Sequence, residues 1–312
     1  MKYLQLKVAE FLARVFPRRV SYGLARRGAD LFFLLDRRGR EAVIGNLARI
    51  HAHAGIRFSR RALRALAREN FLNFAKYLVD FFTFLHLPPD KLNELIDFRN
   101  IRVQLDALLA EKRGVVLLTA HLGNWELGAG VLAQLGYPFH AVALWQPDPK
   151  LNALYQSYRT ARGIKVIPFG RAARGCLAVL RRGEIVGLLC DRDYSPAMDT
   201  VEFFGAPARL PHGPARLALA TGAPILMGFL VRVPGDTYEY IVGEPIRVDP
   251  ARDTVASVMA QIVRQLERAV RAHSEQWFLF HNLWDVEQDR VLATAMAFGE
   301  TVPAVQKPGS AR

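Results

Sequence analysis

The sequence predicts an α/β fold, with a mainly parallel or mixed sheet flanked by helices and an N-terminal amphipathic helical subdomain. Two observations indicate this class. From residue 115 onward, short apolar runs alternate with segments that repeat apolar residues at helical spacing. Before that point, the chain of 312 residues is helical in its pattern and strongly basic. Strands that alternate with helices favour a sheet covered on both faces.

The first element is an amphipathic helix that ends before Pro17. Its apolar stripe consists of Leu4, Val8, Phe11, Leu12 and Val15. A second apolar segment, residues 71–85, is interrupted by Lys76 and Asp80 and is ended by Pro88-Pro89. Such a segment suits a helix that lies between core and lipid or lines an apolar groove, and equally a plain core helix.

Further along, the alternation defines the remaining elements. We expect strands at 115–120, 139–145, 164–168, 185–190, 224–233 and 238–248. We expect helices near 124–135, 149–162, 171–182, 213–222 and 253–273. The chain then divides into a basic, membrane-associating helical region 1–98, an α/β domain 99–298 and a tail 299–312. The tail is rich in Pro, Gly and small residues and is expected to be disordered.

The positive charge is concentrated near the N-terminus. Up to Arg68 the chain carries 16 Lys or Arg residues against 4 Asp or Glu residues, a balance of +12 out of a total of +13. A basic amphipathic helix followed by further arginines is typical of a surface that lies on anionic lipid. The alternative is an ordinary helix beside a solvated cationic face. We expect no nucleic-acid binding, because no module with stacking aromatics accompanies the charge.

Composition also limits the cellular context. No run of 18 apolar residues is free of charge, so we expect no ordinary membrane-spanning helix. The N-terminal segment is interrupted by Lys7, Glu10 and Arg14 and lacks the apolar region of a signal peptide. Cys176 and Cys190 make no disulfide framework, and this scarcity fits a reducing compartment.

The most informative motif is a histidine and a carboxylate five residues apart, where an apolar strand ends. His121 follows the strand and Glu126 lies in the next predicted helix. On one helix, five steps turn a side chain by about 500°, which leaves the pair about 140° apart. They can meet only if His121 lies in the turn, for which Gly123 and Asn124 supply the residue types. We therefore predict an imidazole base held in one tautomer by Glu126. The alternative is a capping histidine beside a first-turn acid.

Further motifs across residues 1–290 carry a resemblance to a known family. They are Tyr158-Arg159-x3-Gly163-Ile164-Lys165-Val166-Ile167-Pro168, Cys190-Asp191-Arg192-Asp193-Tyr194, Val201-Glu202-Phe203-Phe204-Gly205, Pro211-x-Gly213-Pro214-Ala215 and Gln276-Trp277-Phe278. With the His-x4-Glu motif, they resemble the bacterial lipid A late acyltransferases and the related phosphatidylinositol mannoside acyltransferases. The resemblance implies a glycerolipid-acyltransferase-like α/β fold behind the N-terminal helices.

The resemblance also implies an activity. It implies a membrane-associated acyltransferase that moves a fatty acyl chain from acyl-ACP or acyl-CoA to a hydroxyl of a glycolipid, either a lipid A precursor or a phosphatidylinositol mannoside. The enzyme would act at the cytoplasmic face of the bacterial inner membrane and need no cofactor. His121 would be the general base, oriented by Glu126. The sequence leaves the acceptor, the acyl length, the donor and the oligomeric state open.

Arg159 and the amides near Gly123 and Asn124 are the predicted contacts of the substrate. In the family's Arg-x3-Gly position, the guanidinium of Arg159 would grip a phosphate or the donor's carbonyl, unless it is only a helix-terminal cation. Backbone N–H groups near Gly123 and Asn124, or Arg159 itself, would stabilise the oxyanion. Direct transfer needs no nucleophile of the protein, and the chain has no Gly-x-Ser-x-Gly motif.

Acidic residues after a later strand complete the predicted site. Asp191 and Asp193 follow the strand 185–190, so they emerge near His121 if the two strands are neighbours. The resemblance suggests that one carboxylate among Asp191, Asp193 and Glu202 positions the acceptor or His121. We expect no bound metal, because no second histidine lies at ligand spacing and HExxH is absent.

Some residues and functions remain as alternatives. We interpret His212 as a local turn residue, and Trp277, Phe278 and Trp284 as core residues. Two other functions fit the same features. One is a lipid ester hydrolase that uses the dyad with water as acceptor, and the other is a non-enzymatic protein that binds membranes.

Overall fold

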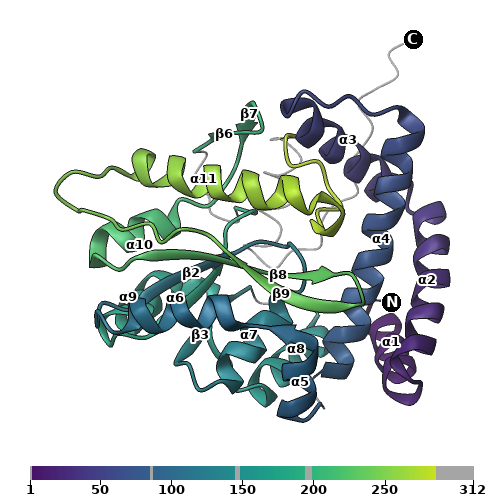
Figure 1. Cartoon of the computed structure of the whole chain (residues 1–312), viewed down its shortest axis with the longest axis horizontal. Helices are drawn as coiled ribbons and strands as arrows, with labels where there is room; N and C mark the ends of the chain where they lie inside the picture. The colour runs from purple at the N-terminus through teal and green to yellow at the C-terminus, as the bar shows by residue number, and fades with distance from the viewer. Residues whose placement is uncertain (1, 85–86, 145–147, 194–198, 286–312) are drawn as a thin grey trace.

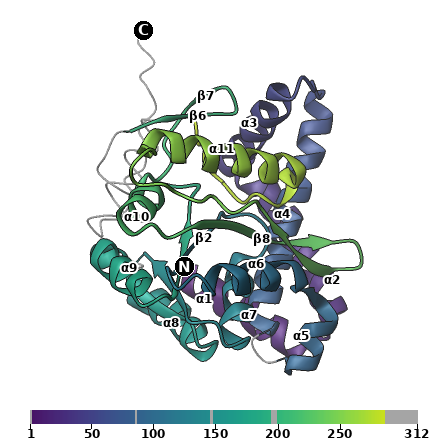
Figure 2. The same ribbon diagram turned by 60° about the vertical axis from the view of Figure 1, so that its left-hand side comes forward.

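The fold of the chain is α/β, as predicted (Figures 1 and 2). The computed structural model describes residues 2–84, 87–144, 148–193 and 199–285. In this described part, five helices precede the first strand, and a mixed sheet with helices on both faces follows. The predicted tail 299–312 lies outside the described residues.

The central sheet, in the described part of the chain, has seven strands in the order β1-β9-β8-β2-β5-β3-β4. Their bounds are β1 Ile96–Asp97, β2 Val115–Thr119, β3 Phe139–Ala143, β4 Lys165–Pro168, β5 Ile185–Leu189, β8 Ile225–Val233 and β9 Thr237–Val242. The central pairs β8·β2, β2·β5, β5·β3 and β3·β4 are parallel, and β8·β9 is antiparallel. All six predicted strands are confirmed. A separate hairpin of β6 (Val201–Phe203) and β7 (Ala206–Ala208), together with the short β1, was not predicted.

The helices that follow the first strand along the chain lie on the two faces of the sheet. The bounds of the helices are α1 Lys2–Val15, α2 Arg18–Leu35, α3 Arg37–His53, α4 Arg60–Thr83, α5 Pro89–Leu95, α6 Arg99–Leu109, α7 Trp125–Gln134, α8 Pro149–Ala161, α9 Ala172–Arg181, α10 Gly213–Thr221 and α11 Val255–Ala272. Val116 and Leu118 of β2 share a core with α9, α10 and α11. Val115 and Leu117 share the opposite core with α6 and α7. Burial on both faces explains why β2 is an unbroken apolar run.

Asp80 on α4 is the centre of a buried polar cluster that joins the N-terminal helices to the sheet. Its carboxylate is fully buried and accepts hydrogen bonds from Arg18 Nε (3.1 Å) and Arg232 Nη2 (2.6 Å). The hydroxyls of Tyr22 and Tyr238 donate to it as well, at 2.7 Å and 2.6 Å from Oδ2. Asp80, one of the two charged residues that interrupt the apolar segment 71–85, therefore makes an ionic contact within the core.

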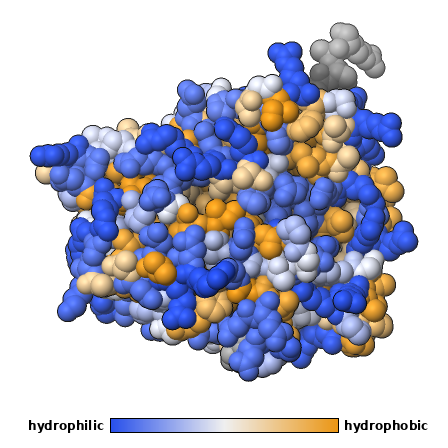
Figure 3. Space-filling model, viewed as in Figure 1, coloured by the Kyte–Doolittle hydropathy of each residue, from blue (hydrophilic) through white to orange (hydrophobic). Residues whose placement is uncertain are grey.

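The first two helices keep apolar side chains on the surface. Leu4 and Phe11 of α1 are 68% and 63% exposed, and Leu34 and Leu35 of α2 are 63% and 73% exposed. Apolar side chains reach the surface along the edge of the molecule where these helices lie (Figure 3). Among the described helices, none combines the length and the apolar character needed to cross a bilayer.

Removing the buried carboxylate should destabilise the fold strongly. Asp80→Ala removes the nearer anion of buried Arg232 and leaves only Asp236 at 3.5 Å among the described carboxylates, and we expect a loss of about 3–5 kcal/mol in the free energy of unfolding, measured by urea titration. Asp30→Ala is the matched control, because it breaks the Arg68 pair, whose side chains are 48% and 29% exposed. That loss should stay below about 1 kcal/mol. Similar losses for the two variants would contradict the ionic role of Asp80.

Candidate active site

The carboxyl ends of β2 and β5 bring His121 and Asp191 together. The two strands are parallel with Thr119 opposite Leu189, so the second residue after each lies at the same edge of the sheet. His121 Nδ1 is 2.8 Å from Asp191 Oδ1, and the backbone N–H of His121 donates to Oδ2 at 2.9 Å. The prediction that the acidic residues 191 and 193 lie near His121 if the strands are neighbours is confirmed for Asp191.

Asp191 is held as a carboxylate. It is fully buried, and the indole N–H of Trp277 donates to its Oδ2 at 2.9 Å. Burial raises the pKa of Asp191, but the interaction with His121 outweighs burial and brings the pKa to about 2. Each oxygen thus accepts a hydrogen bond, and the side chain is fixed from three directions.

The surroundings of His121 favour the neutral form of its imidazole. Burial lowers its pKa below the ordinary value of 6.5, while Asp191 acts in the opposite direction. We infer that the imidazole is neutral at pH 7, with its proton on Nδ1 donated to Asp191. Nε2 has no hydrogen-bond partner among the described residues, and His121 lines a large cavity. Nε2 can therefore accept a proton from a group in that cavity.

The turn between β2 and α7 is fixed by its backbone. Gly123 has φ 65°, and a Cβ there would lie 2.1 Å from the carbonyl oxygen of Leu230. The N–H of Gly123 donates to Gln276, and that of Asn124 donates to Leu230. Asn124 is buried and caps α7 by accepting from Leu127 N–H at 3.1 Å. The side chain of Asn124 thus holds the turn, the backbone N–H groups of Gly123 and Asn124 are both bonded within the protein, and the contact of Asn124 with substrate stays a prediction.

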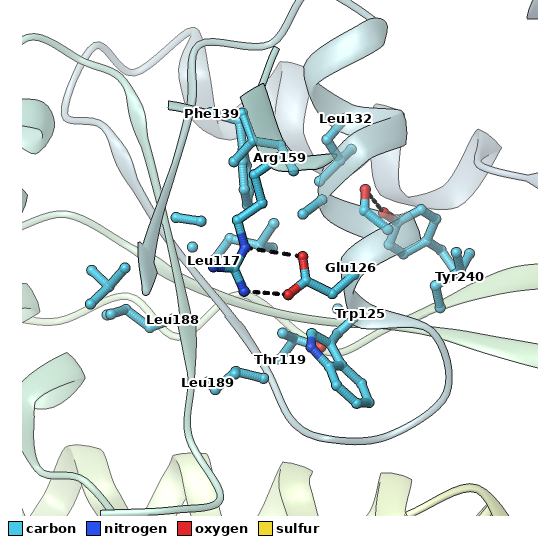
Figure 4. A pocket seen from close by; sticks show the side chains of 18 residues that line it. Leu117, Thr119, Trp125, Glu126, Leu132, Phe139, Arg159, Leu188, Leu189 and Tyr240 are labelled. Carbon is cyan, nitrogen blue, oxygen red and sulfur yellow. Dashed lines mark hydrogen bonds and ion pairs between the residues drawn. The ribbon is translucent and has the colours of Figure 1, made fainter. Parts of the chain in front are cut away.

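Glu126, the predicted partner of His121, pairs with Arg159 instead. Arg159 Nη2 and Nε donate to the two carboxylate oxygens at 2.5 Å and 3.3 Å (Figure 4). The pairing prediction was wrong because strand register places Asp191 at Nδ1, while Glu126 lies in the first turn of α7 and faces the end of α8. The fork of Arg159, predicted to grip phosphate or a carbonyl, is taken up by Glu126.

Two cavities meet at this ion pair. The larger has a volume of about 1040 Å³ and contains His121 in its lining. The smaller, about 70 Å³, lies between α7 and the sheet and is lined mostly by apolar residues such as Leu132 and Phe139 (Figure 4). The residues lining both are Trp125, Glu126, Val142, Arg159, Leu188 and Leu189. The ion pair is therefore a polar boundary shared by two largely apolar spaces.

The other predicted residues differ in whether they line one of the two cavities. Asp193 is buried, lines the large cavity and pairs with Arg209 at 3.6 Å. Glu202 is exposed on β6 and lines neither of these two cavities, so its place in the site stays a prediction. The short hairpin of β6 and β7 carries its side chain to the surface. His212, interpreted as a turn residue, lies before α10 and also lines the large cavity.

Two residues of the site were interpreted from the sequence only as core. Trp277 orients Asp191, and the N–H of Phe278 donates to the carbonyl oxygen of His121 at 2.7 Å. Phe278 also lines the large cavity. Both come from a segment far along the chain, and no sequence spacing relates that segment to His121.

The described part of the site carries neither a cluster of metal ligands nor a thiol that ionises readily. Among the described residues, no three His, Cys, Asp or Glu side chains are grouped so as to hold a metal ion. Cys176 lines the large cavity, but burial raises the pKa of its thiol to about 11. Burial also raises the pKa of Cys190 well above its usual range. His121 with Asp191 is the arrangement that can do chemistry.

Comparison with known proteins relates the chain to one family along most of its length. The family described as bacterial lipid A biosynthesis acyltransferase matches residues 3–285. A phosphatidylinositol mannoside acyltransferase of Mycobacterium tuberculosis (strain ATCC 25618 / H37Rv) is 32% identical over 196 residues, and the match spans 60% of each protein's length. The corresponding protein of Mycolicibacterium smegmatis is 27% identical over 292 residues, 89% of this chain and 90% of the relative. A lipid A biosynthesis lauroyltransferase of Escherichia coli is 26% identical over 202 residues, 64% and 63% of the two chains.

The protonation state of His121 can be measured directly. We expect ¹⁵N-histidine NMR to show the Nδ1–H tautomer at pH 7 and a titration below pH 6.5, with the signal assigned by its absence in His121→Gln. Because the folded pKa lies below the unfolded one, the histidine's contribution to stability falls as pH drops through 6.5. An Nε2–H tautomer or a titration above pH 6.5 would exclude this state.

Proposed function

The chain belongs to the bacterial lipid A biosynthesis acyltransferase family, and we propose that it transfers a fatty acyl chain from a thioester to a hydroxyl of a membrane glycolipid. One observation carries the proposal. A neutral histidine, oriented by a buried carboxylate, opens with its free nitrogen into a cavity of about 1040 Å³. The cavity is lined largely by apolar side chains, as a site for lipid substrates requires.

The proposed chemistry is a direct transfer. An acceptor hydroxyl has a pKa far above 7, so a base must remove its proton as its oxygen attacks the thioester carbonyl. His121 Nε2 takes that proton, and Asp191 stabilises the imidazolium through Nδ1–H. The tetrahedral intermediate collapses, the C–S bond breaks, and the thiolate receives the proton from the imidazolium. The products are an acyl ester of the glycolipid and a free thiol.

Glu126 and Arg159 bound the proposed substrate cavity. They form its polar wall on the side of the smaller cavity, and each neutralises the other in a largely apolar place. Removing one partner would leave the other charge buried without compensation. We therefore assign to this pair the shape of the cavity beside His121, and Asp193 contributes a further acid to the same lining.

The acceptor class follows from the relatives. The mannoside acyltransferases match at 32% and 27% identity and the lauroyltransferase at 26%, so we propose a phosphatidylinositol mannoside as the first acceptor to test. The donor is an acyl thioester, acyl-ACP or acyl-CoA.

The N-terminal helices are the proposed membrane surface. The apolar side chains that α1 exposes adjoin a region with a balance of +12 up to Arg68. Leu6 of α1 lines the large cavity, so α1 forms part of the cavity wall as well as an exposed apolar surface. We propose that residues 1–98 hold the protein peripherally on the cytoplasmic face of the inner membrane.

The dyad is tested by substitution. His121→Ala should abolish acyl transfer, and Asp191→Asn should lower kcat by on the order of 10²–10⁴ because the imidazole loses its fixed tautomer. The assay supplies acyl-CoA or acyl-ACP with a phosphatidylinositol mannoside and quantifies acylated glycolipid and free fatty acid. His140→Gln is the control, because His140 lies on β3 and pairs with Glu184 outside both cavities.

Two results would reject the proposal. One is near-wild-type turnover by His121→Ala while the protein melts normally. The other is release of free fatty acid at a rate that does not depend on the acceptor, which would instead indicate a lipid ester hydrolase.

Membrane binding depends on the exposed face of α1. The double substitution Val8→Ser and Phe11→Ser should weaken sedimentation with anionic vesicles, and added salt should weaken it further because the basic region contributes. Val103→Ser is the matched control, since Val103 is 69% exposed on α6. Equal binding by the double variant and the control would remove α1 from the membrane surface.

A further inference from the structure

The oxyanion of the tetrahedral intermediate needs a hydrogen-bond donor, and the groups predicted from the sequence are already occupied. The N–H of Gly123 donates to Gln276, and that of Asn124 donates to Leu230. Arg159 gives its fork to Glu126. Glu126 also neutralises the charge of Arg159, so the proposed acyl transfer would be served better by a cation of the cavity that no carboxylate pairs.

Arg192 lies where a donor to the oxyanion is needed. It follows Asp191 at the end of β5 and lines the large cavity with His121. Its Nη2 donates to the carbonyl oxygen of Phe278 at 3.1 Å. The N–H of the same Phe278 donates to the carbonyl oxygen of His121. Phe278 therefore holds the guanidinium of Arg192 beside the backbone of His121.

Arg192 also keeps an unused donor. Its Nε is buried away from the cavity and has no hydrogen-bond partner among the described residues. Its Nη1 also makes no hydrogen bond to a described residue, and because Arg192 lines the cavity, Nη1 is the group that a substrate oxygen can reach. A guanidinium is well suited to this, because it presents several N–H groups in a fixed plane and stays charged.

The other arginines described along the large cavity are neutralised by acids. Arg159 pairs with Glu126, and Arg216 pairs with Asp199 at 3.1 Å. No salt bridge joins Arg192 to a carboxylate of the described residues. Arg192 interacts with the carboxylate of Asp191 only at longer range, where its charge helps to lower the pKa of Asp191, so its N–H groups are not taken up by a carboxylate.

We propose that Arg192 is a further catalytic residue, whose guanidinium donates to the thioester carbonyl oxygen as that oxygen becomes an oxyanion. The proposal rests on the acyl transfer proposed above. The negative charge forms on the carbonyl oxygen when the acceptor attacks and disappears when the thiolate leaves, so Arg192 stabilises mainly the transition state.

The charge of Arg192 has a second consequence at His121. Burial lowers the pKa of His121 most, Asp191 raises it, and Arg192 and His281 lower it. Removing the cation should therefore raise the pKa of the base. The protonated, inactive form would then persist to a higher pH.

Kinetics of three variants test the proposal. Arg192→Ala and Arg192→Gln should lower kcat by about 10²–10³-fold with little change in KM, because the interaction forms only in the transition state. Arg192→Lys should keep part of the activity, since a point charge replaces the planar donor. Arg182→Ala is the charge-matched control, because Arg182 is half-exposed and pairs with Glu184 outside both cavities.

The pH profile separates catalysis from architecture. In Arg192→Ala and Arg192→Gln, the acid limb of kcat/KM should move to higher pH, while in Arg192→Lys it should stay in place. A role confined to holding Phe278 would lower the melting temperature, and kcat at a pH above the shifted limb would stay close to that of the wild type. If Arg192→Ala does not fold, the Gln and Lys variants give the same comparison.

Three outcomes would overturn the proposal in a wild-type protein that transfers acyl groups. One is a kcat of Arg192→Gln within roughly threefold of wild type, and another is a rise in KM alone, which indicates ground-state binding of an anion. The third is an acid limb that does not move. Failure of the proposed function is distinct, because the wild-type protein itself would then show no transfer.

Discussion

Parallel pairing of β2 with β5 is the constraint on which the site depends. Because Thr119 lies opposite Leu189, each strand delivers its second following residue, His121 and Asp191, to the same edge of the sheet. A slip of one residue would turn the side chains of one strand to the other face and separate the pair. The register is held by burial, since β2 is covered on both faces and its alternating residues belong to two different cores. The apolar core therefore sets the geometry of the polar pair.

The turn that carries His121 is connected to the N-terminal helices through hydrogen bonds. Asn124 caps α7, and its Nδ2 lies 3.4 Å from the hydroxyl of Tyr238. That hydroxyl donates to Asp80 on α4, which also accepts from Arg18 on α2. The helices proposed to rest on the membrane and the turn that holds the base thus share one buried polar cluster. This arrangement fixes the active-site turn relative to the proposed membrane surface.

The sequence predicts the elements of this fold well and their contacts less well. Long apolar runs and helical spacing are local, so β2, β5 and the helices α7 to α11 could be predicted, whereas β1, β6 and β7 are too short to show a period. The partner of His121 could not be identified from spacing along the chain. Five residues separate His121 from Glu126, but the contact that forms is set by the register of two strands, which is a non-local property. The role of Trp277 depends on the same kind of long-range contact.

The two acids near His121 therefore differ in their physical roles. A carboxylate at the end of a neighbouring strand is rigid, and Asp191 is held further by the indole of Trp277, so it can fix one tautomer of the imidazole. Glu126 lies in the first turn of a helix and meets a guanidinium in a largely apolar place, where neither charge is tolerated without the other. The spacing motif in the sequence thus joins two separate contacts. One is the hydrogen bond between neutral His121 and Asp191, which we propose supports proton transfer, and the other is the ion pair of Glu126 with Arg159 in the wall of the cavity. Arg192, the residue after Asp191, makes no salt bridge with a described acid, and this is why we propose it as the group that meets a developing negative charge.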